Sequence, residues 1–265
     1  MSTPRAWCNG RPADAQALQS LALANYGHFT SMQVRGRAVQ GLDLHLQRLA
    51  EGNRVLFDAP LDASQVVGWM RLALADAPDA SLRVTLFSRM FDHRQPQRPC
   101  IPDVLVSIAP AAQAGAGTIA LRSFAFQRAL PSLKHAATLP LFHYRRQARL
   151  EGCDDALFVA PGDGRVIEGS VWNVAFWDGT QALWPQAEAL RGTCESLVRQ
   201  GFAQLGVAQG ERIITLEEAR HLAAITLNAA GLQLVKSIDG VPLPEGDALL
   251  GLALRALETR PWIPL

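Results

Sequence analysis

The stretch Leu130–Arg146, LPSLKHAATLPLFHYRR, contains Lys134, the one fully charged side chain between Arg128 and Arg145. A lysine is rarely buried unless it is paired with an opposite charge or used chemically. Lys134 could lie at the edge of a strand, with its amine reaching water. It could instead form a Schiff base, because burial lowers the pKa of a lysine and leaves more of the neutral, nucleophilic amine. The stretch alone leaves both alternatives open.

The composition places the chain among globular proteins and excludes several classes of partner. Of its 265 residues 49% are hydrophobic and 18% charged, as expected for a protein with a core. A net charge of +1 gives no bulk attraction to nucleic acid or to an anionic membrane surface, so we expect neither partner. The polar start is unlike a signal peptide, and no apolar run nears the roughly 20 residues of a membrane span. The cysteines show no metal-ligand spacing, which predicts no metal site and a cytoplasmic location: Cys8, Cys100, Cys153 and Cys194.

The chain divides at a segment of small residues and proline, APAAQAGAG over 109–117, which is typical of a linker. We therefore predict a small α/β domain over 1–110, an interdomain linker over 111–117 and a larger domain over 118–265. In the first domain, apolar periodicity predicts strands over 28–36, 81–89 and 102–110, and helices over 42–57 and 62–77, with Asp43 as a cap.

The larger domain is predicted to mix strands and helices as well. Its turn PGDG at 161–164 indicates a hairpin. The remaining elements expected are a strand over 118–126, helices over 142–152, 190–206 and 246–260, and two strands within 223–240.

A second chemical feature is Glu168, in the strand-like run VIEGSVWNVAF over 166–176. It could be an exposed carboxylate at a strand bend. It could also be buried and face a cationic ligand group, such as a protonated pyridine nitrogen. Asn173, in the same run, could fix a loop or bind a ligand oxygen.

A third feature is ALRGTCESLVRQ over 189–200, which predicts a loop followed by a helix that Thr193 could cap. A helix N-terminus offers free amides to an anion, although an ordinary capped helix is equally compatible with the pattern. TLNAAGL over 226–232 would permit close approach of a ligand. Arg48, in HLQRL over 45–49, would by itself be read as a solvated arginine.

The order and spacing of these pieces resemble the class IV aminotransferases, the fold-type IV family of pyridoxal-phosphate enzymes. That family includes branched-chain aminotransferases, D-amino-acid aminotransferases and 4-amino-4-deoxychorismate lyases. The resemblance extends from about Tyr26 to Gly240. It implies an α/β fold with a small N-terminal domain and a larger domain built on a barrel-like sheet, usually in a homodimer.

The resemblance also implies roles for individual residues. Lys134 would hold pyridoxal 5′-phosphate as a Schiff base and move the proton between substrate and cofactor. Glu168 would pair with the pyridine nitrogen. The phosphate would be bound by Arg48, by the backbone amides of Thr193 and Cys194 after Gly192, and by Asn228, with Thr226 as the alternative to Asn228.

The sequence departs from the family pattern in three places. The turn that is usually L-P-G-I-T-R is LRGTCE here, and Leu139 stands where branched-chain enzymes have a tyrosine. The strand that is usually F-G-D-G-V-Y-E is YGHFTSM here, so that His28 and Ser31 would reshape the substrate pocket. Arg89 or Arg83 could bind a substrate carboxylate, although each could equally be a surface arginine.

These implications define the expected function and its alternatives. The first expectation is an aminotransferase that moves an amino group between an amino acid, or an amine, and a 2-oxo acid. The alternative is a lyase of the aminodeoxychorismate type, which releases pyruvate through the same lysine. A cofactor-free relative would lack a reason to combine Lys134, Glu168 and Arg48 in one chain.

Overall fold

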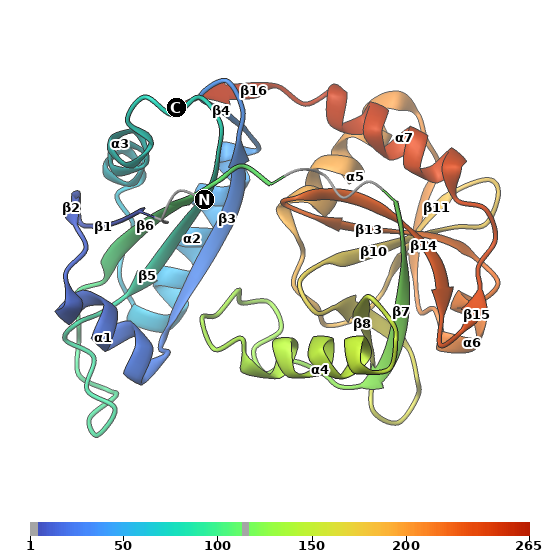
Figure 1. Cartoon of the computed structure of the whole chain (residues 1–265), viewed down its shortest axis with the longest axis horizontal. Coiled ribbons are helices and arrows are strands. Elements are labelled where there is room, and N and C mark those ends of the chain that lie inside the picture. The colour runs from blue at the N-terminus through green and yellow to red at the C-terminus, as the bar shows by residue number, and fades with distance from the viewer. Residues whose placement is uncertain (1–4, 113–116) are drawn as a thin grey trace. The chain divides into compact units, whose positions relative to one another are not determined.

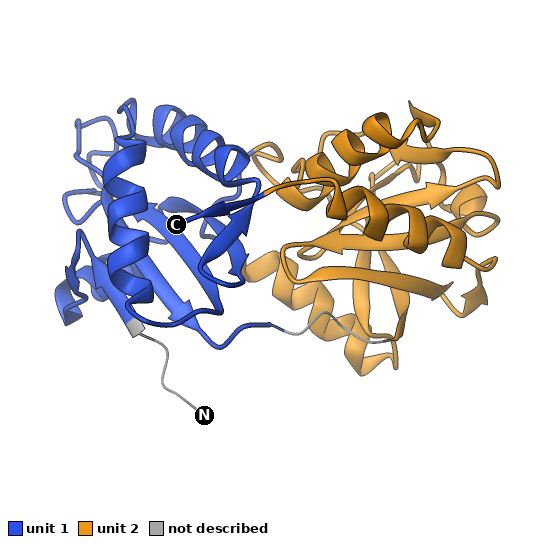
Figure 2. Cartoon of the chain, turned by 90° about the horizontal axis from the view of Figure 1, so that it is seen from above, with its two compact units in different colours: residues 1–112, 133–137, 262–265 blue, residues 113–132, 138–261 orange. Residues whose placement is uncertain are grey.

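The computed structural model describes residues 5–112 and 117–265, which form two compact units (Figure 2). Unit 1 contains the described residues up to Ala112, together with 133–137 and 262–265. Unit 2 contains those from 117 to 132 and from 138 to 261. Residues 113–116 of the predicted linker lie outside the described residues.

Unit 1 is built on a five-stranded antiparallel sheet with the strand order β2-β1-β6-β5-β3 (Figure 1). Its strands are β1 (Arg5–Cys8), β2 (Arg11–Pro12), β3 (Gly27–Val34), β5 (Ala80–Phe87) and β6 (Asp103–Ala109). A separate pair joins β4 (Ala38–Gln40) to β16 (Trp262–Pro264). The helices are α1 (Ala15–Ala24), α2 (Leu42–Phe57) and α3 (Ala63–Leu74). The predicted strands and helices of this region are all present.

The two faces of this sheet are covered differently. Alternate residues of β5, among them Leu82, Val84 and Leu86, join the main apolar core with side chains of α2 and α3. Part of the opposite face packs against α1 through a smaller apolar cluster. The predicted cap of α2 is wrong. The helix is preceded by Gly41 in a left-handed conformation, and Asp43 lies in the first turn instead.

The lysine segment lies against β3 of this sheet. The amide of Phe29 donates to the carbonyl of Lys134 at 2.9 Å, and the amide of Ala136 donates to the carbonyl of Gly27 at 2.7 Å. These bonds place residues 133–137 in unit 1, although the sequence assigns them to the range 118–265.

Unit 2 is built on a nine-stranded sheet with the order β12-β11-β10-β13-β14-β7-β8-β9, and β15 pairs with β14. Because β9 also packs against β10 and β11, the sheet curls on itself as a half-barrel (Figure 1), which confirms the predicted barrel-like sheet. Its strands are β7 (Thr118–Ala125), β8 (Asp155–Val159), β9 (Val166–Gly169), β10 (Asn173–Trp177), β11 (Ala182–Pro185), β12 (Gln209–Arg212), β13 (Ala223–Asn228), β14 (Gly231–Ile238) and β15 (Val241–Pro242).

Four helices complete unit 2: α4 (Leu139–Leu150), α5 (Thr193–Leu205), α6 (Leu216–Ala219) and α7 (Asp247–Glu258). Helices α5 and α7 pack on each other and share an apolar cluster with β13. The predicted hairpin is confirmed: β8 and β9 are antiparallel, and Gly164 adopts a φ of 65° in the turn. No helix in the described part of the chain is long and apolar enough to cross a membrane.

Candidate active site

In unit 1 the backbone of Lys134 is fixed by its bond to β3, and its amine reaches an aromatic ring. The Nζ atom of Lys134 lies 5.0 Å from the ring centroid of Phe29, the residue whose amide binds the carbonyl of Lys134. A cation over an aromatic face is attracted by the negative face of the ring. The lysine is therefore held at both its backbone and its side chain.

The same part of unit 1 contains a buried histidine, His45, whose pKa is lowered. It is buried on α2, and its Nδ1 lies 2.6 Å from the hydroxyl of Thr30 on β3. Burial, together with the positive charges of Arg48 and Lys134, lowers the pKa of His45 to about 3. His45 is thus neutral at pH 7, and Lys134 and Arg48 are both near enough to influence its charge.

Of the predicted substrate residues in unit 1, His28 is buried and Ser31 is half-buried, both on β3. Burial lowers the pKa of His28 to about 4. Gly52 of α2 packs directly on the His28 ring, since a Cβ at this glycine would lie 2.5 Å from Nδ1. A side chain larger than hydrogen at position 52 would therefore displace the imidazole.

The two arginines considered for a substrate carboxylate lie in different surroundings. The guanidinium of Arg89 donates to Asp103 at 2.8 and 3.1 Å, and the Arg89 amide donates to the same carboxylate. Arg83 lies opposite Ser31 on β5, and its guanidinium carbon is 3.5 Å from the centroid of Phe29. Arg83 therefore shares the ring of Phe29 with Lys134, whereas Arg89 anchors the segment that follows β5.

In unit 2 the carboxylate of Glu168 is buried on β9 and paired with a buried arginine. Arg128 donates from Nε to Oε1 at 3.1 Å and from Nη2 to Oε2 at 3.2 Å, and its guanidinium also binds the carbonyl of Pro131. Arg128 is 8% and Glu168 6% exposed. Two charges buried this deeply require such a pairing, because an isolated buried charge is costly.

The N-terminus of α5 is the second part of the site in unit 2. Gly192 is the N-cap and Thr193 the first helical residue, so the predicted cap at Thr193 is wrong by one residue. No side chain caps this helix, which leaves its first amides to other acceptors. Burial raises the pKa of Cys194 to about 12, so its thiol stays protonated and adds no negative charge beside the first amides of α5.

Asn173 fixes the loop that leads into α5, which is the first of the two roles considered for it. Its Nδ2 donates to the carbonyl of Leu190 at 2.6 Å. A Cβ at Gly192 would lie 2.1 Å from Oδ1 of Asn173, so only glycine fits here. The register that pairs Asn173 with Leu227 places Asn228 at this same end of the sheet.

Asn228 ends β13 and makes a local turn, in which its Oδ1 accepts from the amide of Ala230 at 2.7 Å. The alternative residue, Thr226, is buried.

The predicted residues fall into two sets. Unit 1 holds His28, Ser31, Arg48, Arg89 and Lys134, and unit 2 holds Glu168, Gly192, Thr193, Cys194 and Asn228.

Two residues that act on the predicted ones were not themselves predicted, namely Arg128 in unit 2 and His45 in unit 1. A carboxylate in an apolar strand needs a cationic partner, so Glu168 could have prompted a search for a buried arginine. For His45, its place three residues before Arg48 on an amphipathic helix was the available signal.

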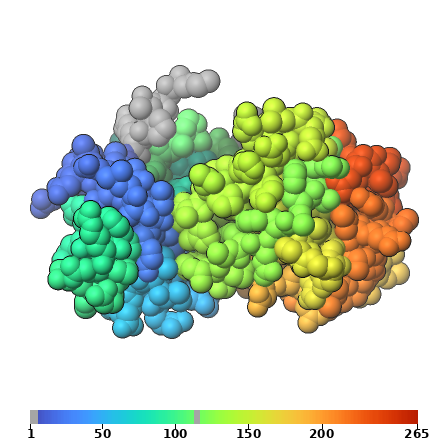
Figure 3. Space-filling view, turned by 90° about the horizontal axis from the view of Figure 1, so that it is seen from below, coloured from blue at the N-terminus to red at the C-terminus, as the bar shows by residue number. Residues whose placement is uncertain are grey.

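Leu139, at the position where branched-chain enzymes carry a tyrosine, begins α4 and is 77% exposed. Helix α4, yellow-green in Figure 3, lies on the surface of unit 2. An exposed leucine supplies no hydrogen bond to a buried ligand.

Comparison with known proteins gives a family and a set of similar structures. A family model described as amino-transferase class IV matches residues 27–238. A search of curated proteins finds no match. The structure resembles a branched-chain aminotransferase from Thermoproteus uzoniensis with norvaline, at a TM-score of 0.85 and 21% identity over 95% of this chain and 93% of the other.

Two further structures have similar scores. A hypothetical aminotransferase from Mycobacterium tuberculosis, in its PLP-bound form, gives a TM-score of 0.78 at 21% identity, over 96% of this chain and 99% of the other. A putative 4-amino-4-deoxychorismate lyase from Legionella pneumophila gives 0.80 at 18% identity, over 93% and 96%. At these identities the likeness shows the fold, and it confirms the predicted fold-type IV architecture.

Proposed function

Since the chain belongs to the class IV aminotransferase family, we propose that it is a pyridoxal-phosphate enzyme that moves an amino group between an amino acid, or an amine, and a 2-oxo acid. The observation that carries the proposal is the family match over residues 27–238, a range that contains Lys134 and Glu168. The similar structures include a PLP-bound aminotransferase, which supports the same cofactor.

The donor groups of the chain suit the chemistry of pyridoxal phosphate. We assign the pyridine nitrogen to Glu168, a buried carboxylate that Arg128 orients through two hydrogen bonds. The phosphate is assigned to the uncapped N-terminus of α5, where the glycine at 192 permits close approach, and to Arg48 and Asn228. Lys134 supplies the amine for the cofactor's aldehyde carbon.

The cofactor, when bound, supplies an electron sink that stabilises negative charge at the substrate's Cα. In our proposal Nζ of Lys134 would be the group that takes the proton from the substrate's Cα and holds it beside the cofactor. Glu168 would accept a hydrogen bond from the protonated ring nitrogen and would hold it positive. Neutral His45 adds no third positive charge beside Lys134 and Arg48, and its bond to Thr30 fixes α2 against β3.

For the substrate we propose contacts from β3 and its neighbour, namely His28, Ser31 and an arginine. A substrate carboxylate at Arg89 would have to displace Asp103, which already takes two of its donors. Arg83 lies opposite Ser31 and shares the Phe29 ring with Lys134. This geometry favours Arg83 over Arg89 as the partner of a carboxylate.

The second candidate function is a lyase of the 4-amino-4-deoxychorismate type. Two observations favour it: the similarity to the putative lyase structure and the exposed leucine at position 139, which departs from the branched-chain pattern. Both candidates use Lys134. In an aminotransferase the cofactor would carry the amino group after the first half-reaction, whereas in the lyase it would not.

The first test is covalent capture of the cofactor. Purified protein supplied with pyridoxal phosphate is expected to be yellow, and borohydride reduction with peptide mapping is expected to find the phosphopyridoxyl group on Lys134. Lys134→Ala is expected to abolish both capture and turnover. A Lys134→Ala variant that still turns over, or a protein that takes up no pyridoxal phosphate, would refute the proposal.

A donor–acceptor panel then separates the two reactions. An aminotransferase converts the bound cofactor to its pyridoxamine form when an amino acid is added without an acceptor. Release of pyruvate from aminodeoxychorismate without that conversion would identify the lyase. We also propose a homodimer, as is usual in this family, and light scattering of the purified chain measures its mass.

A further inference from the structure

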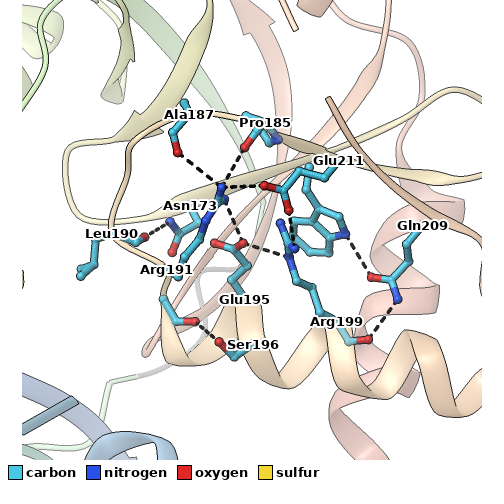
Figure 4. Close-up of polar contacts among 12 residues, drawn as sticks. Asn173, Pro185, Ala187, Leu190, Arg191, Glu195, Ser196, Arg199, Gln209 and Glu211 are labelled. Carbon is cyan, nitrogen blue, oxygen red and sulfur yellow. Dashed lines mark hydrogen bonds and ion pairs between the residues drawn. The ribbon is translucent and has the colours of Figure 1, made fainter. Parts of the chain in front are cut away.

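The loop that leads into α5 is held at three consecutive residues. Leu190 is fixed through its carbonyl by Asn173, and Gly192 packs against the same side chain. Arg191, between them, is fixed by its guanidinium, which donates to the carbonyls of Pro185 and Ala187 at 3.2 and 3.4 Å (Figure 4). The anion-binding end of α5 therefore depends on where Arg191 is held.

Arg191 also belongs to a balanced network of two arginines and two glutamates (Figure 4). It binds Glu195 at 3.2 Å and Glu211 at 3.1 Å. Arg199 binds the same two carboxylates, Glu195 at 3.0 Å and Glu211 at 2.8 Å. Because each glutamate contacts both arginines, the network closes on itself with no net charge.

Glu195 is the buried member of this network. Its side chain is 2% exposed, whereas that of Glu211 is 41% exposed. Burial raises the pKa of Glu195, and the charges of Arg191 and Arg199 oppose that rise. An unpaired carboxylate in the first turn of α5 would repel an anion, so the two arginines allow Glu195 to lie there.

The network is tied to the sheet through Arg199. Its guanidinium carbon lies 4.6 Å from the ring centroid of Trp184 on β11, and its carbonyl accepts from Gln209 on β12 at 3.1 Å. Glu195 thus links Arg191, which holds the loop, to Arg199, which contacts β11 and β12. Arg191 and Glu195 are also the proline and arginine positions of the family turn L-P-G-I-T-R, so the two departures compensate each other.

We propose that Glu195, acting through Arg191, is a positioning residue that pre-forms the phosphate site at the N-terminus of α5. The inference rests on the proposed function, because the anion it prepares for is the phosphate of the cofactor. Glu195 touches no reacting atom in this scheme. Its effect is on the affinity for phosphate, and turnover at saturating cofactor does not depend on it.

The test uses Glu195→Gln in the full-length protein freed of cofactor, with Glu217→Gln as the matched control. Glu217 is an exposed glutamate on α6. Pyridoxal phosphate is titrated by absorbance, and inorganic phosphate by its competition with pyridoxal phosphate. Glu195→Gln keeps an oxygen acceptor for Arg191 but removes the negative charge that strengthens this hydrogen bond. The weaker hold on Arg191 predicts an increase of about tenfold in both dissociation constants. The turnover number at saturating cofactor should stay near that of the wild type, and Glu217→Gln should change neither quantity.

A merely structural role predicts a different result. Glu195→Gln would then lower the melting temperature of the cofactor-free protein and leave both dissociation constants unchanged, which would overturn the inference. Arg191→Gln combined with Glu195→Gln should weaken cofactor binding no more than either change alone, and additive losses would also contradict the inference.

If Glu195→Gln does not fold, Glu211→Gln replaces it as the test, at the exposed edge of the network. It should weaken cofactor binding by a smaller factor, and unchanged affinity would overturn the inference. A wild-type chain that binds no pyridoxal phosphate refutes the proposed function itself.

Discussion

Arg128 and Glu168 form a deeply buried ion pair. Replacing Arg128 with methionine removes the guanidinium that binds the buried carboxylate of Glu168, which is expected to lower the free energy of unfolding by about 3–5 kcal/mol. Urea denaturation of the cofactor-free protein measures the loss.

The double variant Arg128→Met, Glu168→Gln removes both charges and should recover most of that stability. The control is Arg165→Met, which breaks the exposed pair with Asp163 and should change the stability little. Equal losses in the single and double variants would show that lost packing, and not the lost guanidinium partner of Glu168, dominates.

The lowered pKa of His45 predicts that the free energy of unfolding depends on pH. Its ordinary pKa of 6.5 is lowered to about 3 in the folded protein, so the unfolded chain binds a proton at a pH where the folded chain does not. The free energy of unfolding must therefore fall as the pH falls, by about 2 kcal/mol from His45 between pH 7 and pH 5. His28, with a folded pKa of about 4, acts in the same direction.

Urea denaturation at several pH values checks this dependence. His45→Asn keeps a polar atom near the position of Nδ1 and should flatten the dependence on pH. His221→Asn, at an exposed position, should leave the slope as in the wild type. A slope that His45→Asn does not change would show that other groups cause the acid sensitivity.

At the residue scale, the sequence revealed side chains whose chemistry is unusual for their surroundings. Lys134 and Glu168 stood out because each is a charge in an apolar run. Arg128 did not, because its partner lies 40 residues away and nothing in the sequence joins them. Arg191 and Glu195 are four residues apart, but their network also includes Glu211 on β12, which no local pattern joins to them.

At the scale of elements, the approach of Asn173 to Gly192 predicts the effect of a single methyl group. Gly192→Ala would place Cβ 2.1 Å from Oδ1 of Asn173, and relief requires the loop or the amide to move. We expect affinity for pyridoxal phosphate to fall by about tenfold, the effect of losing one good hydrogen bond to a charged group.

The matched control is Gly68→Ala, in the middle of α3, where a Cβ would meet open space. It should stabilise the protein by about 0.5–1 kcal/mol and leave cofactor affinity unchanged. Absorbance titration and thermal melting give the two quantities. Unchanged affinity in Gly192→Ala would mean that the loop adapts without loss.

Helices and strands with a clear apolar periodicity were predictable from the sequence. Elements that depend on pairing with a distant strand were not. Helix α2 has leucines near helical spacing, and its predicted range 42–57 is the observed one. The start of α4 was missed by three residues, although Thr138 at the N-cap and Pro140 in the first turn are both signals of a helix start. Strands β4 and β16 are three residues each, too short to carry a pattern, and each exists because the other pairs with it.

At the scale of the whole molecule, the last described residues complete unit 1. Ile263 pairs with Val39, the amide of Leu265 donates to the carbonyl of Arg37, and Leu265 packs on the core of unit 1. Deletion of residues 262–265 is expected to lower the stability of unit 1 by about 2 kcal/mol, through lost backbone bonds and apolar burial. Amide hydrogen exchange across residues 38–40 should accelerate.

Trp262→Ala is the control for that deletion. It keeps the backbone pairing and removes a side chain that is 44% exposed, so exchange across 38–40 should change less. If the deletion leaves exchange as slow as in the wild type, β4 does not depend on β16.

The pairing of β16 with β4 also has a consequence for the order in which the chain is made. Domains of a nascent protein usually fold as they leave the ribosome, the N-terminal one first. Here the first unit to emerge cannot finish folding until its closing strand is synthesised, after the whole of unit 2. The segment 133–137, which contains Lys134, also arrives late and can join β3 only when translation is about half complete.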